Sequence, residues 1–350
     1  MSHPPLTVIC PGSNLSPRVS GILEAALAVT DAEILKDISA PLHGKRILFA
    51  VSLDDAGQNE GLYRLLGQLR RDRTLLSGSA AGILVDGGDL YTKSTARELA
   101  LAVNQSDCTL VGKTLVEGTS DLRNFTVQAK NALCGLEDAY RLAAVDLVRR
   151  IVAFSPPKHR RPKVTVLHAS SHRTSSTMAL WKYVRPQLED CCEFTEIGLR
   201  NGTMEDCAGC PYTMCLHFGE KGDCFYGGVM VREVYPAVRD ADAVVLLCPN
   251  YNDALSANLT AAINRLTALY RTTPFTDKAV YALVVSGYSG SDIIASQTIS
   301  AMCMNKGFYM PAGACLMETA NSAGEVLALP GIHDRLDAFA SRLRKQLCDL

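Results

Sequence analysis

The chain has 350 residues, of which 47% are hydrophobic and 20% charged, and it is long enough for two domains of ordinary size. Its 35 lysines and arginines nearly balance its 36 aspartates and glutamates, so the formal charge of −1 gives no field that would attract nucleic acid or an anionic membrane. No apolar run approaches the length that spans a bilayer, and the first ten residues lack the pattern of a secretory signal. We therefore expect a cytoplasmic protein with neither nucleic acid nor membrane as a partner.

The first half of the chain reads as alternating strands and helices, and parts of it parallel the second half. Residues 6–23 (LTVICPGSNLSPRVSGIL) have the order strand, serine-containing loop and helix, as do residues 164–181 (VTVLHASSHRTSSTMALW). Residues 82–104 parallel residues 281–303 in the same way. The pattern predicts a reduced α/β domain of the same class that lacks a cysteine-rich segment found later. The alternative is that any two domains built of strand–helix units look this similar.

A boundary between the two halves is predicted at residues 155–162. This segment reads SPPKHRRP, and its three prolines can continue neither a helix nor a central strand. We therefore expect a first domain at 1–154, a linker at 155–162 and a second domain at 163–350.

The second half has five strand-like runs, each followed by a helix-like segment. Continuous apolar runs such as AVVLLC (243–248) are typical of strands that are buried on both faces of a parallel sheet. Five such units with short connections predict a doubly wound α/β domain with a five-stranded parallel sheet in the order 2-1-3-4-5. The strands are expected at 164–169, 193–199, 243–248, 278–285 and 314–320, and the helices at 176–184, 229–239, 255–271, 292–305 and 333–347.

Hydroxyl side chains are crowded between the first of these strands and its helix. The N–H groups at the start of a helix are free and carry partial positive charge, so short hydroxyl donors there favour a bound phosphate, and Arg173 would neutralise part of its charge. The segment lacks the glycine patterns of dinucleotide and nucleoside-triphosphate sites, and a single phosphomonoester fits better. The alternative is a serine-rich helix cap without a ligand. The hydroxyl residues are Ser170, Ser171, Thr174, Ser175, Ser176 and Thr177.

Two further loops are expected beside this one. In the order 2-1-3-4-5 the loops after strands 1, 3 and 4 meet at the carboxyl edge of the sheet, where ligands of such folds bind. Residues 249–258 (PNYNDALSAN) follow the third strand and residues 286–292 (SGYSGSD) the fourth. Both loops are rich in residues that suit backbone hydrogen bonding, and each carries a tyrosine that suits a planar ring.

These three loops resemble those of the flavodoxin-like NAD(P)H-dependent FMN reductases and the related iron–sulfur flavoproteins, over roughly residues 163–345. The resemblance implies a flavodoxin-like fold and an FMN cofactor whose phosphate is held by the hydroxyl loop and Arg173. Asp253 is expected either to contact the edge of the flavin ring or to cap the next helix. The resemblance places the ring against Pro249, Asn250, Tyr251 and Asn252, with Ser286, Gly287, Tyr288 and Gly290 at its other edge.

Four of the 13 cysteines fall in one short segment after the second strand. Four thiolates at such spacings are able to hold a [4Fe–4S] cluster or a zinc ion, and iron–sulfur flavoproteins carry a four-cysteine loop at this place. The last two gaps are longer than in that family, so free or redox-active thiols stand beside both metal interpretations. The four residues are Cys207, Cys210, Cys215 and Cys224.

Other reactive and charged residues are predicted to have structural roles. Cysteines outside the segment, such as Cys348, are expected to be small buried hydrophobic side chains. Asn264, Arg265 and Arg271 are expected to be solvated or to face a dimer partner.

The leading functional hypothesis is an FMN oxidoreductase that takes electrons from NAD(P)H. Its acceptor would be a small molecule such as a quinone, flavin, nitro compound or enone, and the protein would act as a homodimer. FMN would carry out the hydride chemistry, so no catalytic acid–base pair is predicted. The alternative is an electron-transfer protein that uses FMN, with or without an iron–sulfur cluster, between redox partners.

Overall fold

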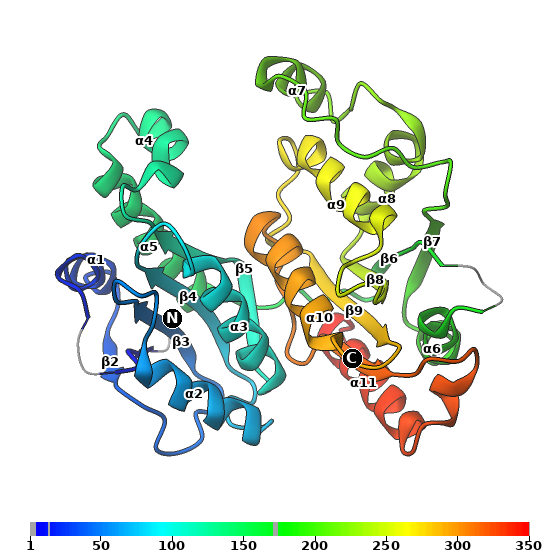
Figure 1. Ribbon diagram of the computed structural model, residues 1–350, viewed down its shortest axis with the longest axis horizontal. Coiled ribbons are helices and arrows are strands. Elements are labelled where there is room, and N and C mark those ends of the chain that lie inside the picture. Colours follow the sequence, from blue (N-terminus) through cyan, green and yellow to red (C-terminus); the bar gives the residue numbers. More distant parts are fainter. Residues whose placement is uncertain (1–4, 13–14, 171–173, 350) are drawn as a thin grey trace. The chain divides into compact units, whose positions relative to one another are not determined.

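The structure is a computed structural model that describes residues 5–12, 15–170 and 174–349. The chain forms two compact units, unit 1 (Met1–Ser155) and unit 2 (Pro156–Leu350), shown in Figure 1. In the predicted linker, the backbone N–H of His159 donates to the carbonyl of Leu347 over 2.9 Å, so this part of the segment is tied to unit 2. We propose that the units correspond to the two domains expected from the sequence.

Unit 2 is built on a parallel five-stranded sheet. Read from one edge, its order is β7-β6-β8-β9-β10, which is 2-1-3-4-5 in chain order, as predicted. Every residue of β9 is buried, and all of β8 is buried except its last residue, because helices cover both faces. The strands are β6 (Lys163–His168), β7 (Glu193–Gly198), β8 (Ala243–Pro249), β9 (Ala279–Ser286) and β10 (Cys315–Thr319).

The helices of unit 2 form two layers. Helices α6 and α11 lie on one face of the sheet, and α8, α9 and α10 lie on the other (Figure 1). Trp181 of α6, the only tryptophan, is fully buried in the core. The α-helices are α6 (Ser176–Val184), α7 (Tyr212–Gly219), α8 (Tyr235–Asp240), α9 (Ala257–Tyr270), α10 (Ser291–Thr298) and α11 (Ile332–Leu347); π-helical turns η3 (Met230–Val234) and η4 (Ile299–Asn305) adjoin α8 and α10, and 3-10 turns lie at η2 (Arg185–Leu188) and η5 (Glu325–Ala328).

Unit 1 has the same topology, with five parallel strands in the order β2-β1-β3-β4-β5. The predicted likeness of unit 1 to unit 2 is therefore confirmed. Unit 1 was also expected to lack a segment that unit 2 has, and the missing segment is not a strand. It lies between β2 and β3, where residues 36–45 contain no helix, whereas residues 199–242 of unit 2 contain α7, η3 and α8 at the equivalent place. The strands are β1 (Leu6–Ile9), β2 (Ala32–Leu35), β3 (Arg46–Ser52), β4 (Ala80–Asp86) and β5 (Thr109–Gly118).

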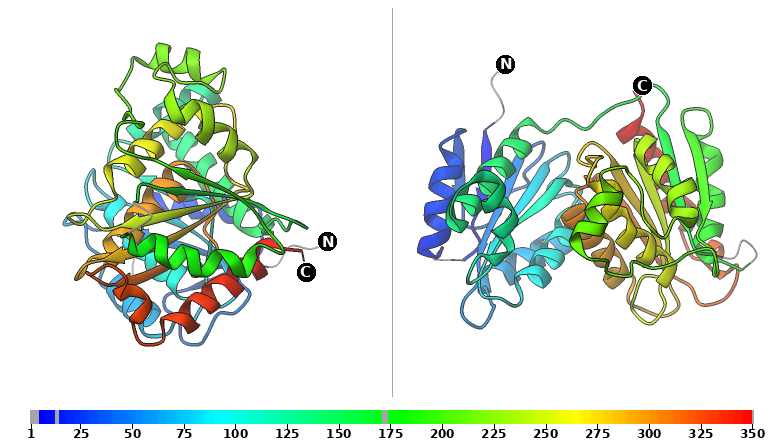
Figure 2. Two further views of the ribbon diagram at one scale, coloured as in Figure 1. Left: turned by 90° about the vertical axis from the view of Figure 1, so that its right-hand side faces the viewer. Right: turned by 90° about the horizontal axis from the view of Figure 1, so that it is seen from above.

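The helices of unit 1 also cover both faces of its sheet, as the right-hand view of Figure 2 shows. A partly buried ion pair supports this unit, since the half-buried Arg18 guanidinium contacts the buried Asp86 carboxylate over 2.8 Å. Within the described residues, no helix has both the length and the apolar character that crossing a bilayer requires. The helices are α1 (Pro17–Leu27), α2 (Glu60–Arg71), α3 (Thr92–Gln105), α4 (Thr126–Ala132) and α5 (Leu136–Ala153), with a 3-10 turn η1 (Arg123–Phe125).

Candidate functional site

The hydroxyl loop of unit 2 joins the carboxyl end of β6 to the start of α6. Ser175 is the N-cap of α6, and its Oγ accepts a hydrogen bond from the backbone N–H of Met178 over 3.2 Å. Thr177 Oγ1 is buried and lies 3.0 Å from Ser175 Oγ and 3.3 Å from Ser170 Oγ. Three of the predicted hydroxyls are therefore joined at the positive end of the helix. Thr174 is exposed and Ser176 is half-buried.

Two residues that the sequence predicts for this loop, Ser171 and Arg173, lie outside the described residues. Their part in a phosphate site therefore stays a prediction. The helix cap predicted as the alternative is present at Ser175. A cap uses one hydroxyl, and the remaining hydroxyls and free N–H groups are still available to a phosphate group.

The loops after β8 and β9 are joined through one side-chain amide. Asn250 Nδ2 lies 3.0 Å from Ser286 Oγ, 3.0 Å from the carbonyl oxygen of Ser289 and 3.2 Å from Asp253 Oδ1. Ser291 Oγ in turn donates to Ser286 Oγ over 2.8 Å. Because β8 and β9 are neighbours in the sheet, the amide holds together two loops that are far apart in the sequence.

Backbone conformation brings these two loops into close contact. Asn252 and Asp253 have φ values of 54° and 55°, and Gly290 has φ of 85°. A Cβ atom on Gly290 would lie 2.3 Å from Asp253 Oδ1 and 2.9 Å from Asn250 Nδ2, so only glycine fits there. Asp253 accepts its bond from Asn250 and does not cap α9, for which Ser256 is the N-cap.

Both predicted tyrosines present their rings at the surface. Tyr251 is 60% exposed and Tyr288 is 82% exposed. Asn321 Nδ2 donates to the Tyr288 hydroxyl over 2.9 Å and anchors that side chain. Exposed aromatic rings in neighbouring loops suit a planar ligand, because each offers an apolar face together with a polar tip.

Several backbone N–H groups around these loops remain available to a ligand. Among the described residues they donate to no protein acceptor, and they come from the start of α6 and from the loops after β8 and β9. Free donors at the carboxyl ends of neighbouring strands favour a ligand that carries phosphate or carbonyl oxygens. They belong to Ser176, Thr177, Asn252, Asp253, Gly287 and Tyr288.

Part of unit 2 matches a known protein family. Residues 162–322 match the sequence model of the family described as NADPH-dependent FMN reductase. Unit 2 contains a domain of this family. The match covers all three loops of the site, and the domain is called the FMN-reductase domain below. No curated protein matches the chain significantly.

Solved structures that resemble the chain are distant. The apo form of an NADH:FMN oxidoreductase has 15% sequence identity over 54% of this chain and 91% of its own, with a TM-score of 0.35. The NAD(P)H:quinone oxidoreductase from Methanothermobacter marburgensis has 16% identity over 53% of this chain and 94% of its own, with a TM-score of 0.37. FerB, an NAD(P)H:(acceptor) oxidoreductase from Paracoccus denitrificans, has 16% identity over 53% and 98%, with a TM-score of 0.33.

The four clustered cysteines of the FMN-reductase domain line a single cavity of about 120 Å³. Zinc–sulfur bonds of about 2.3 Å would bring four thiolates within about 3.8 Å of one another. Among the described residues, no three of these four sulfurs lie within 4.8 Å of one another. The four thiols are therefore not already gathered at zinc-binding distances, and an iron–sulfur cluster, a zinc ion and free thiols remain as the three interpretations of this segment. The residues are Cys207, Cys210, Cys215 and Cys224.

Side chains of α9 and of its C-cap residue contact the cysteine segment, and one of them corrects a prediction. Arg265 is only 3% exposed, and it donates to the carbonyl oxygens of Glu205 over 3.3 Å and Gly227 over 2.7 Å. It was expected to be solvated or to face a partner, but its guanidinium instead fixes both ends of the segment. Arg271 Nη2 lies 3.7 Å from the sulfur of Cys215.

A second group of thiols was missed. Cys192 Sγ lies 3.7 Å from Cys191 Sγ and 4.0 Å from Cys348 Sγ. Cys348 is buried as expected, but it is not isolated. Burial raises the pKa of Cys348 to about 11 and also raises the pKa of Cys192, so these two thiols stay protonated at neutral pH. The adjacent residues Cys191 and Cys192 are the only sign of this thiol group in the sequence. Nothing in the sequence connects them to the C-terminal helix.

Proposed function

We propose that the FMN-reductase domain binds FMN beyond the carboxyl ends of β6, β8 and β9 and passes electrons from NAD(P)H to a small organic acceptor. The family match supports the cofactor and the class of reaction. The observation that carries the placement is the set of free N–H donors and joined hydroxyls in these three loops. FMN, when bound, supplies the hydride and electron chemistry.

The hydroxyl loop would hold the phosphate. Ser170, Ser175 and Thr177 donate hydrogen bonds to its oxygens, and the free N–H groups of Ser176 and Thr177 add the positive end of α6. Since these groups are already held together in the protein, ordering them costs little when the phosphate binds. In the same proposal, Arg173 neutralises part of the charge of the phosphate.

The loops after β8 and β9 would hold the ring. Tyr251 and Tyr288 offer exposed aromatic faces. The free N–H groups of Asn252, Asp253 and Gly287 stabilise negative charge on a reduced ring, because fixed dipoles need no reorganisation during the reaction. The positive φ values of Asn252 and Asp253 set the direction of those N–H groups.

Substitution of one buried hydroxyl tests the phosphate site. Thr177→Val keeps the shape of the side chain but removes the hydroxyl that contacts Ser170 and Ser175, and we expect FMN affinity to fall roughly tenfold. Thr114→Val is the matched control, because Thr114 is equally buried in unit 1 and donates to the carbonyl of Ala81 over 3.2 Å. Quenching of FMN fluorescence measures both. Equal affinities in the two variants would contradict the proposed phosphate site.

A second candidate function, electron transfer between redox partners, rests on the cavity that all four clustered cysteines line. If the cavity holds an iron–sulfur cluster, anaerobically prepared protein contains iron and acid-labile sulfide, and Cys210→Ala loses both. Cys248→Ala, which removes a buried cysteine of β8, is the control and retains them. Protein without iron, whose FMN is still reduced by NADPH, rules out this second function.

The finer parts of the proposal concern acceptor, assembly and location. We propose a quinone, flavin, nitro compound or enone as acceptor, a homodimer and a cytoplasmic location. Steady-state turnover with each acceptor class, together with the mass of the protein in solution, tests the first two.

A further inference from the structure

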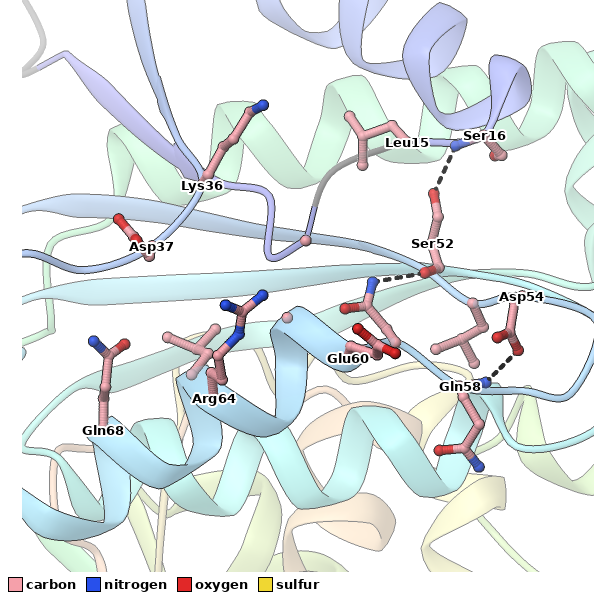
Figure 3. Close-up of a pocket in the computed structure, with 15 residues that line it drawn as sticks. Leu15, Ser16, Lys36, Asp37, Ser52, Asp54, Gln58, Glu60, Arg64 and Gln68 are labelled. Carbon is pink, nitrogen blue, oxygen red and sulfur yellow. Dashed lines mark hydrogen bonds between the residues drawn. The ribbon is translucent and has the colours of Figure 1, made fainter.

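Unit 1 contains a cavity of about 680 Å³, outside the residues that match the FMN reductase family. Its walls come from the segments that follow β1, β2 and β3 and from the first turns of α2 (Figure 3). Cavities that bind small molecules have volumes of roughly 300 to 1,000 Å³. This cavity also lies where the strand order reverses between β1 and β3, the usual ligand position in a sheet of this type.

Hydrogen bonds within the protein connect three of the segments that form the walls. The backbone N–H of Ser16 donates to Ser52 Oγ over 3.0 Å. Asn59 Nδ2 donates to the carbonyl oxygen of Ser52 over 2.8 Å, and Asn59 Oδ1 accepts from the N–H of Leu62 over 2.9 Å. These bonds connect Ser16, before α1, and Asn59, the N-cap of α2, to the end of β3, so these parts of the wall are held in place without a ligand.

A close backbone contact between α2 and Gly12 also holds this part of the cavity wall in place. A Cβ atom on Gly61 would lie 2.0 Å from the backbone nitrogen of Gly12, so α2 approaches the loop after β1 as closely as the chain allows. Gly12 has φ of 92°, a conformation that other residues rarely adopt. Any larger side chain at residue 61 would push this wall of the cavity outward.

Four charged side chains that line the cavity have no partner among the described residues. Lys36 and Asp37 follow β2, and they lie across the cavity from Arg64 of α2 (Figure 3). Glu60 is the first residue of α2. Within the part of the chain that the structure describes, none of the four forms a hydrogen bond or an ion pair. By contrast, the lining carboxylate of Asp54 accepts from the N–H groups of Ala56 and Gln58.

This arrangement suits a ligand that has both an anionic group and hydroxyl groups. Lys36 and Arg64 are the groups that pair with a phosphate. Asp37 stands just after the second strand, where a carboxylate binds ribose hydroxyls in nucleotide-binding sheets. Leu15 and Leu65 add apolar surface for a planar base.

We infer that this cavity of unit 1 is a second small-molecule site, which takes a ribonucleoside monophosphate. Arg64 and Lys36 bind its phosphate, and Asp37 accepts hydrogen bonds from its ribose hydroxyls. The inference does not depend on FMN binding in unit 2, since every residue in it belongs to unit 1.

Calorimetric titration of the full chain with AMP, UMP and adenosine tests the phosphate contact. We expect AMP or UMP to bind, and adenosine to bind at least about tenfold more weakly than AMP if AMP is the ligand. Arg64→Gln should weaken binding of the monophosphate about tenfold and leave adenosine binding unchanged. Arg71→Gln is the matched control on the same helix, since Arg71 is exposed and lies outside the cavity, and it should change nothing.

Two further variants complete the test. Lys36→Gln should weaken monophosphate binding in the same direction as Arg64→Gln, and both side chains are exposed and unpaired, so neither variant should change the thermal unfolding temperature. Asp37→Asn should weaken binding of the ribonucleotide but not of its 2′-deoxy form. Absence of AMP and UMP binding at about 1 mM overturns the inference. Binding that is equal in Arg64→Gln and Arg71→Gln overturns it too, because the nucleotide then sits elsewhere in the chain.

Discussion

Substitution of Asn250 gives the clearest test of the proposed flavin site. Its amide has two hydrogens for the three acceptors around it, Ser286 Oγ, the Ser289 carbonyl and Asp253 Oδ1, so at most two bonds are at full strength. At about 1 kcal/mol per bond, and less where water reaches the pair, Asn250→Ala should lower the free energy of unfolding of unit 2 by about 1–2 kcal/mol. It also frees the loop after β8 from the loop after β9.

Loss of this connection should weaken FMN binding about tenfold, because both loops must then be ordered when the cofactor binds. Trp181 is the only tryptophan and is buried in unit 2, so its fluorescence follows urea unfolding of that unit alone. Quenching of FMN fluorescence gives the dissociation constant of the same samples.

Asn258→Ala is the control for this experiment. Asn258 also lies in unit 2, where the structure places it in the first turn of α9 and not in the loop that is proposed to hold the ring. Its amide donates to the Leu199 carbonyl over 2.7 Å and to Asn201 Oδ1 over 3.0 Å. We expect a similar loss of stability in this variant and no change in FMN affinity. If both variants lose FMN affinity equally, or if Asn250→Ala retains it, the idea that this amide organises a flavin site is refuted.

Two further predictions concern stability and thiol reactivity. Asp86→Ala leaves the Arg18 guanidinium without its carboxylate and should lower the free energy of unfolding by about 2–3 kcal/mol. Circular dichroism during urea unfolding measures this change, and a value below about 0.5 kcal/mol would show that the ion pair is unimportant. At about pH 8, iodoacetamide should modify the exposed Cys207 well before Cys10 and Cys248, because burial raises the pKa of Cys10 to about 11 and that of Cys248 to about 12. Peptide mass mapping checks the order, and equal rates would contradict it.

The fold of unit 2 could be predicted because its strands are buried on both faces and read as continuous apolar runs. β8 and β9 are the clearest examples. In unit 1 the strand β2 was not predicted from the sequence. It has only four residues, and none of them is buried. A short exposed edge strand has no apolar run to reveal it, so the sequence shows the class of this unit but not its complete sheet.

The candidate site was predictable where it depends on residues close in sequence, such as the cap at Ser175. It was not predictable where the contact depends on how distant segments approach each other. The burial of Arg265 follows from two carbonyl groups about 40 to 60 residues away in the chain, and no helical pattern could show them. Cys348 meets Cys191 and Cys192 for the same kind of reason.

The central claim is that the FMN-reductase domain holds FMN and accepts electrons from NAD(P)H. Its most direct test is an anaerobic visible spectrum of the FMN-loaded protein before and after one equivalent of NADPH. We expect the absorption of bound flavin to bleach within the time of mixing and to return when a quinone is added. If the purified protein takes up no FMN, or if bound FMN keeps its oxidised spectrum with both NADPH and NADH, the proposed function is wrong.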